Sequence, residues 1–115
     1  MDIKRIAASP GRSKAVSFEK LIWAVANASS QEEDFSQQVD EMFQSAVNTL
    51  SQAGSGIDKL LSVQIFLADI KNKEAFDGLW YNWIGTDPHH WPQRICIEAR
   101  LAAGLLVEMQ IVATL

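Results

Sequence analysis

The sequence predicts one α+β domain, a mixed six-stranded sheet with two helices packed on one face. Apolar segments of strand length stand before, between and after two segments with helical periodicity, in the order β-β-β-α-β-α-β-β. Strands grouped around helices in this way are typical of α+β domains. No repeat or Pro/Gly/Ser-rich linker divides the chain, so residues 1–115 are expected to form a single domain.

The first three strands are expected at residues 3–7, 14–18 and 21–28. Residues 21–26 read LIWAVA, an apolar run short enough for a buried strand. A polar break at residues 17–20 separates it from the preceding strand and favours a hairpin between the two.

The first helix is predicted to begin at residue 35. Its apolar residues recur every three or four positions and line one face: Phe35, Val39, Met42, Phe43, Ala46, Val47 and Leu50. The acidic run Glu32-Glu33-Asp34 suits the positive end of the helix dipole. Gly54 stands where a left-handed residue commonly ends a helix.

The second half of the chain adds one helix and three strands. Residues 60–68 are apolar on both faces, which is typical of a strand inside a sheet. A helix is expected at residues 73–84, with the larger apolar side chains buried: Phe76, Leu79, Trp80, Trp83 and Ile84. Two further strands are expected at residues 94–99 and 105–113, with Gly104 in the turn between them.

Side chains alternate between the two faces of a strand, so each of the last two strands has an inner and an outer set. We expect Ile95 and Ile97 to lie under the helices, opposite Arg94 and Cys96. On the final strand Val107, Met109 and Ile111 are expected inside, with Glu108 outside. Two helices cover only one face, so the other face is expected to mediate self-association.

Composition excludes several classes of function. The net charge is −4 and the ten basic residues are scattered, which argues against nucleic-acid binding. A single Cys cannot form an intramolecular disulfide. No apolar stretch approaches the ~20 residues that span a membrane. We therefore expect a cytoplasmic protein that does not bind membranes.

Two C-terminal segments carry a family resemblance. Residues 92–98 read Pro-Gln-Arg-Ile-Cys-Ile-Glu, and residues 106–113 form a strand with Glu108 in it. Residues 47–54 and 61–70 are similar to the helix-to-strand passage of the same family. Over residues 5–115 the chain resembles the RidA/YjgF (Rid) family of small enzymes that hydrolyse reactive imines.

The resemblance implies a chorismate-mutase-like fold and a homotrimer with clefts between subunits. It implies that Arg94 binds a substrate carboxylate, that Cys96 contributes backbone contacts, and that Glu108 places the attacking water. The reaction would convert 2-aminoacrylate-type enamines and imines to 2-keto acids and ammonia. It requires no metal and no organic cofactor.

The chain departs from the family pattern at three places. Arg12, followed by Ser13, stands where deaminating members carry a cleft Tyr, and Val25-Ala26 replaces Ser-Gly. Trp80 replaces an Asn of the second helix. The complete set of expected ligand-binding residues is Arg94, Arg12, Ser13, Cys96, Ala26 and Trp91, the last as a cleft-lining side chain.

Simpler interpretations remain open for these residues. Arg94 could be a structural ion-pair partner of Glu98 or Glu108, and Cys96 could be a small buried hydrophobe. His89 and His90 are adjacent and have no third His, which argues against a metal site. The alternative to a deaminase is a non-catalytic sensor of small carboxylates, and ribonuclease activity is the least favoured hypothesis.

Overall fold

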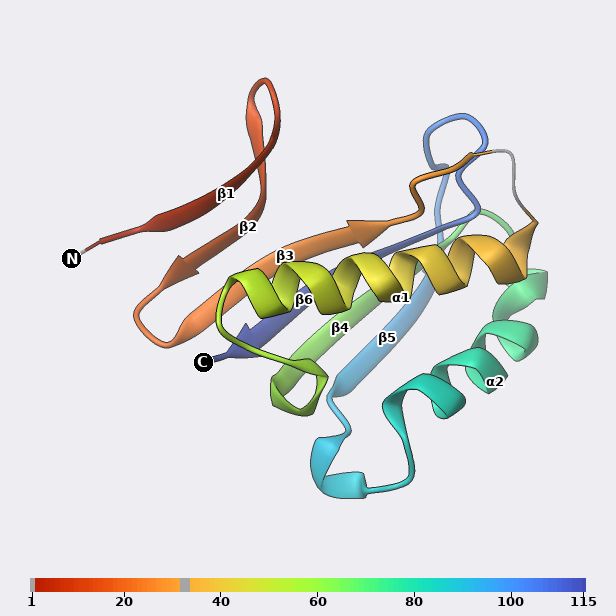
Figure 1. The fold of residues 1–115 in the computed structure, drawn as a ribbon. Helices are drawn as coiled ribbons and strands as arrows, with labels where there is room; N and C mark the ends of the chain where they lie inside the picture. The colour runs from red at the N-terminus through yellow and green to blue at the C-terminus, as the bar shows by residue number, and fades with distance from the viewer. Residues whose placement is uncertain (1, 32–33) are drawn as a thin grey trace.

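A computed structural model describes residues 2–31 and 34–115 (Figure 1). Six strands form one sheet in the order β1-β2-β3-β6-β4-β5. Two α-helices lie on the same side of that sheet. The strands are β1 Lys4–Ser9, β2 Arg12–Phe18, β3 Leu21–Asn27, β4 Leu60–Leu67, β5 Gln93–Glu98 and β6 Val107–Thr114. The helices are α1 Phe35–Gln52 and α2 Lys73–Ile84. The predicted fold class and element order are confirmed.

Helix α1 covers the middle of the sheet. Asp34 caps it by accepting a hydrogen bond from the Gln37 N–H, at 2.9 Å. Glu32 and Glu33, expected at the same end, lie outside the described residues. Of the predicted apolar face, the buried members are Val39, Met42, Phe43, Ala46 and Leu50. Val47 is 37 % exposed, because it lies at the margin of the stripe.

Strand β4 lies inside the sheet, as its apolar sequence predicts. It pairs antiparallel with β6 on one side and parallel with β5 on the other. A parallel pair requires a crossover connection, and α2 supplies it. The inner residues of β6 are fully buried as expected, at Val107, Met109 and Ile111. Glu108 therefore projects from the opposite face, which carries no helix.

The predicted orientation of β5 is wrong. Arg94 and Cys96 face the helices, because they pair with the buried Val63 and Ile65 of β4. Ile95 and Ile97 lie on the free face, 53 % and 41 % exposed. The alternation of side chains along a strand assigns these pairs to opposite faces, but it does not say which face lies under the helices. At this edge, α2 presents an acid and aromatic rings that suit an arginine better than an isoleucine.

The β1–β2 hairpin turns away from the rest of the sheet (Figure 1). Its pairing is irregular: Ile6 is opposite Ala15 and Ala7 is opposite Ser13. Lys14 consequently has no partner residue in β1 and forms a β-bulge. Bulges redirect side chains and are common beside functional sites. Arg12 and Ser13, expected just before a strand, begin β2 instead.

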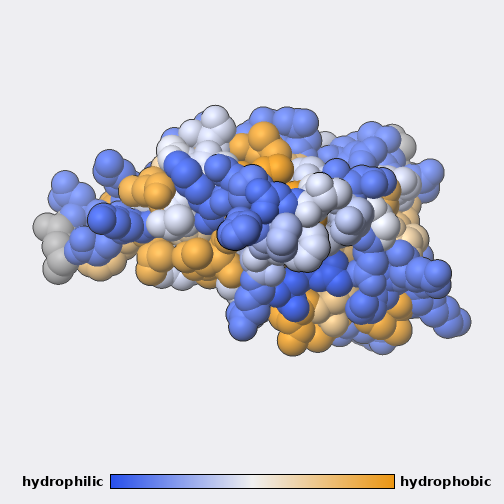
Figure 2. All heavy atoms as spheres, turned by 90° about the horizontal axis from the view of Figure 1, so that it is seen from below, coloured by the Kyte–Doolittle hydropathy of each residue, from blue (hydrophilic) through white to orange (hydrophobic). Residues whose placement is uncertain are grey.

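The free face of the sheet is strongly apolar for an exposed surface. Figure 2, which views the molecule from below Figure 1 and not onto this face, also shows apolar side chains in surface patches between hydrophilic ones. Large apolar residues at least 37 % exposed on β3 and β5 are Leu21, Trp23, Val25, Ile95 and Ile97. We call these five residues the apolar sheet face. Their exposure supports the expectation of self-association.

Candidate active site

A cavity of about 510 Å³ lies where the β1–β2 hairpin separates from β3. We call it the wedge cavity. Its lining includes the predicted residues Arg12, Ser13 and Glu108, together with Lys14 and Asn27. Glu108 accepts a hydrogen bond from the Asn27 side-chain amide at 3.3 Å. The Arg12 Nε donates to Ser9 Oγ at 2.8 Å. The structure thus brings three predicted site residues together within one chain.

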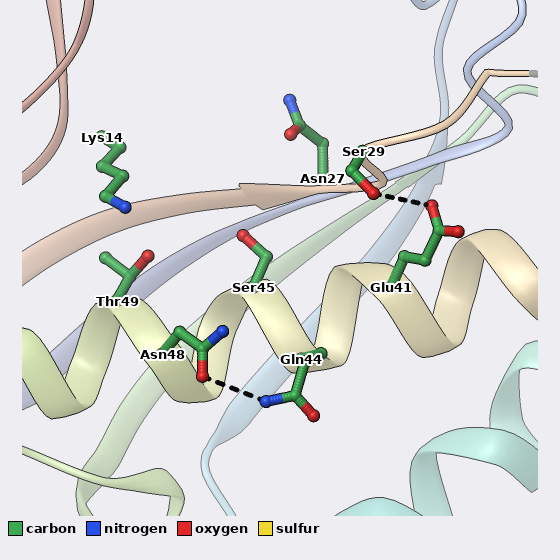
Figure 3. A pocket seen from close by; sticks show the side chains of 8 residues that line it. All are labelled: Lys14, Asn27, Ser29, Glu41, Gln44, Ser45, Asn48 and Thr49. Carbon is green, nitrogen blue, oxygen red and sulfur yellow. Dashed lines mark hydrogen bonds between the residues drawn. The ribbon is translucent and has the colours of Figure 1, made fainter.

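A second cavity of about 360 Å³ adjoins the first and lies between β2, β3 and α1 (Figure 3). We call it the helix groove. Lys14, Asn27 and Ser45 line both cavities. The other groove residues are polar: Ser29, Glu41, Gln44, Asn48 and Thr49. The two cavities are therefore adjacent lobes that share three lining residues.

Glu41 is held at one end of the groove by its neighbours. It accepts hydrogen bonds from the Ser30 N–H at 2.9 Å, the Ser29 hydroxyl at 3.2 Å and the Gln37 amide at 3.3 Å. The Ser30 N–H contributes most to a pKa of Glu41 below its usual value, against a smaller opposing effect of burial. This carboxylate is a structural acceptor that ties the segment after β3 to α1.

Arg94 lies elsewhere, at the β5 edge of the sheet. Its guanidinium donates to Asp77 of α2 at 2.6 Å and lies over the rings of Trp80 and Phe76, 5.3 and 5.7 Å from their centroids. Its side chain keeps 21 % of its surface exposed. A guanidinium has five N–H donors, so the bond to Asp77 leaves others for a ligand carboxylate.

Asp77 fixes this arginine electrostatically. Burial raises the pKa of the Asp77 carboxyl, but hydrogen bonds from Lys73 and Arg94 and the charges of both residues outweigh it. The resulting pKa lies below the usual value, so Asp77 is ionised at neutral pH. Lys73 donates to it at 2.8 Å from one turn earlier in α2.

The remaining predicted residues have different surroundings. Cys96 packs against the core, and burial raises the pKa of its thiol despite the nearby charges of Arg94 and Lys73. That environment does not activate a nucleophile. Ala26 is buried under the helices, while its neighbours Val25 and Asn27 line the wedge cavity. Trp91 is 48 % exposed, and its indole N–H donates to the Gly85 carbonyl at 2.9 Å.

Arg94 and the wedge cavity do not meet within one chain. Strands β3, β6 and β4 separate β2 from β5, a distance of roughly 19 Å at the usual strand spacing. Arg94 also faces the helices, whereas Glu108 is on the free face. Both features lie toward sheet edges, where a second copy of the chain can approach.

Sequence reasoning missed Asp77, Lys14 and Asn27. Asp77 had a signal, because it follows Lys73 by four residues and precedes Trp80 by three on one helix. The β-bulge in β2 sets the position of Lys14. The alternating pattern of a strand does not reveal where a bulge will form. Asn27 reaches the site because the register of β3 with β6 places it opposite Glu108, and one strand's sequence does not give that register.

A six-stranded mixed sheet with two helices on one face and a cleft beside the N-terminal hairpin defines a small α+β protein of the YjgF/Rid class. The model of the family described as "Endoribonuclease L-PSP" matches residues 13–115. The chain belongs to this family, which includes proteins named for YjgF, Rid and RutC.

Two relatives illustrate the similarity in sequence. The mitochondrial protein MMF1 of Saccharomyces cerevisiae is 32 % identical over 79 residues, 68 % of this chain and 52 % of the yeast protein. A RutC family protein of Haemophilus influenzae is 38 % identical over 66 residues, 56 % of this chain and 55 % of that protein. The chain thus spans about half the length of the curated relatives it matches.

Solved structures match over the whole chain. A YjgF family protein from Neisseria meningitidis has a TM-score of 0.90 at 28 % identity, covering 99 % of this chain and 95 % of the other. A Rid family protein from Yersinia pestis has a TM-score of 0.90 at 23 % identity, covering 99 % and 100 %, and at that identity shows the fold alone.

Proposed function

We propose that the chain hydrolyses enamine and imine intermediates of the 2-aminoacrylate type to 2-keto acids and ammonia. One observation carries the proposal. The two residues expected to perform the chemistry, Arg94 and Glu108, are each held in a defined hydrogen bond, at two places that a neighbouring copy can join. The active site would then consist of the wedge cavity of one subunit and Arg94 of the next, in a homotrimer.

The apolar sheet face supports this assembly. Ile95 and Ile97 project from the same strand as Arg94 but to the other face. Burial of five large apolar side chains against a second copy would contribute about 1.5–3 kcal/mol for each one that becomes fully buried. In the proposed trimer, the β5 edge of one subunit would lie beside β2 and β3 of its neighbour.

The chemistry needs orientation and one base. Arg94 would bind the substrate carboxylate bidentately. Glu108, held by Asn27, would take a proton from water as the water oxygen bonds to the imine carbon. That proton passes to the imine nitrogen, which gives a carbinolamine. The hydroxyl proton of the carbinolamine then moves to the amino nitrogen, the C–N bond breaks as the C=O bond forms, and ammonia leaves a 2-keto acid. An enamine first takes a proton at its terminal carbon and becomes the imine.

The test measures ammonia release from freshly generated 2-aminoacrylate by the purified protein. Glu108→Gln keeps an acceptor for Asn27 but removes the base, and it should lower the rate by about 10²–10⁴-fold. Arg94→Ala should abolish the activity, with the melting temperature showing that the variant is folded. No acceleration over several amino-acid-derived imines would overturn the proposal.

A non-catalytic sensor of small carboxylates is the second candidate. The observation that favours it is Arg12, which stands in place of the cleft Tyr of deaminating members and lines the wedge cavity. A sensor would be stabilised by 2-keto acids without turnover, and Arg94→Ala would remove that stabilisation.

Ribonuclease activity, which the family description names, has less support. The formal charge is −4, and His89 and His90 lie exposed in a short turn away from the wedge cavity. RNA cleavage that persists in an Arg94 and Glu108 double variant would indicate contamination.

A further inference from the structure

We infer that the helix groove is a specificity subsite that holds a second, distal carboxylate of the ligand. The preferred substrates would then be imines derived from dicarboxylic amino acids. This inference rests on the proposed function for the reaction, but the binding site it describes stands on the groove alone.

Lys14 supplies the charge for such a subsite. The bulge in β2 turns its side chain toward α1, with the ammonium group near Thr49 (Figure 3). The side chain is half-buried. Among residues 2–31 and 34–115, no carboxylate forms an ion pair with Lys14 at 4.0 Å or less. A lysine that lines a polar groove and has no ion-pair partner in the protein can pair with an anionic ligand.

The acid of the groove does not neutralise Lys14. Glu41 lies eight residues before Thr49 on α1, which corresponds to roughly 12 Å along the helix axis. Its oxygens already accept three hydrogen bonds from Ser29, Ser30 and Gln37. In Figure 3 Glu41 and Lys14 stand at opposite ends of the groove. The Lys14 end is therefore locally positive.

Uncharged donors surround the same end of the groove. Gln44 donates to the Asn48 carbonyl oxygen at 3.0 Å, so the NH₂ group of Asn48 remains a donor. The Ser45 hydroxyl points from α1 toward β3 (Figure 3), and the Thr49 hydroxyl lies beside Lys14. One ammonium and several neutral donors match a carboxylate, which accepts hydrogen bonds at both oxygens.

The subsite adjoins the reaction site. Asn27 lines both lobes and bonds Glu108, and Ser45 and Lys14 border both lobes as well. A ligand whose reacting carbon lies at Glu108 can therefore extend a side chain into the groove. The α-carboxylate would meet Arg94 of the neighbouring subunit, and the distal carboxylate would meet Lys14.

The experiment compares imines generated in place by an amino-acid oxidase from glutamate and from glutamine. These two substrates have the same length and differ in distal charge. The glutamate-derived imine should have a kcat/KM about tenfold higher, the size of one charge-assisted hydrogen bond. Lys14→Met should remove that preference, so that the ratio of the two kcat/KM values falls to about one. Thr49→Val should reduce the preference partly, and Lys20→Met is the matched control that removes an exposed lysine elsewhere.

The outcomes separate the two claims. Turnover of 2-aminoacrylate with equal rates for the glutamate and glutamine imines would overturn the inference and leave the proposed function standing. Absence of turnover, with thermal stabilisation by 2-oxoglutarate that exceeds stabilisation by pyruvate and depends on Lys14, would support the subsite and overturn the deaminase. Equal stabilisation by both keto acids without turnover would overturn both.

Discussion

Arg94 has a stable structural role in addition to any role in binding. It bonds Asp77 and lies on the faces of Trp80 and Phe76, an arrangement that fixes both its position and the plane of its guanidinium. The structural interpretation considered for this residue named Glu98 or Glu108 as its partner. Glu98 instead accepts a hydrogen bond from the Ile70 N–H at 2.9 Å. A positioned arginine that keeps free donors is well suited to bind a carboxylate.

Asp77→Asn tests this role through pH. The folded-state pKa of Asp77 is lowered, so its stabilising contribution is present above the unfolded pKa of about 3.9 and is lost as pH falls through the folded value. We expect Asp77→Asn to melt below the parent protein at pH 7 and the difference to shrink progressively as pH falls below about 3.9. Thermal melts across this range provide the measurement, with Asp40→Asn on α1 as control. A difference that persists undiminished at pH 3 would contradict the ion-pair account.

At the scale of elements, the sequence predicts where the helices and strands lie better than it predicts which side of each one is buried. In a long segment such as α1, many apolar residues recur with helical spacing and mark the same face, so the buried side is well determined. The edge strand β5 has only six residues and packs beneath a helix of mixed character, so local hydrophobicity misassigns Ile95 and Ile97. Lys14 could not be placed, because a bulge depends on pairing between strands rather than on one strand's own pattern.

Gln38 joins two elements that are distant in sequence. Its fully buried side chain donates to the Gly104 carbonyl and accepts from the Leu106 N–H, both at 2.8 Å. These bonds attach α1 to the turn before β6. That turn depends on Gly104, which has a φ of +84° and where an added Cβ would lie 2.8 Å from Gln31.

Gln38→Leu should destabilise the protein by about 1–3 kcal/mol, because two backbone groups would lose their partner inside the molecule. Urea denaturation measures this change in the free energy of unfolding. Gln52→Leu, at an exposed position of the same helix, serves as the control. Equal stability of the two variants would show that the Gln38 bonds contribute nothing.

At the scale of the whole molecule, the apolar sheet face and the proposed division of the site between subunits both favour a homotrimer. Two helices cover one face of the sheet, and none of the described helices is both long enough and apolar enough to span a membrane. The other face exposes five large apolar side chains on β3 and β5, and exposed apolar surface favours self-association. A homotrimer would bury them and complete the active site at the same time.

Trp23→Glu tests the assembly. Trp23 is 39 % exposed on β3, and a carboxylate there would have to be buried without a partner in the interface. We expect light scattering after size exclusion to show a monomer for the variant and a trimer for the parent protein. Tyr81→Glu is the control, because Tyr81 is 51 % exposed on α2, away from the sheet. A variant that stays as large as the parent would show that the assembly uses another surface.

The central claim is that Arg94 and Glu108 act together from different subunits, and mixing two inactive variants tests it directly. Arg94→Ala and Glu108→Gln are unfolded together in equal amounts and refolded, and ammonia release is measured. Random assembly would place an intact Arg94 beside an intact Glu108 at about a quarter of the interfaces, so about a quarter of the parent activity should return. A mixture that stays as inactive as its two components would contradict a site shared between subunits.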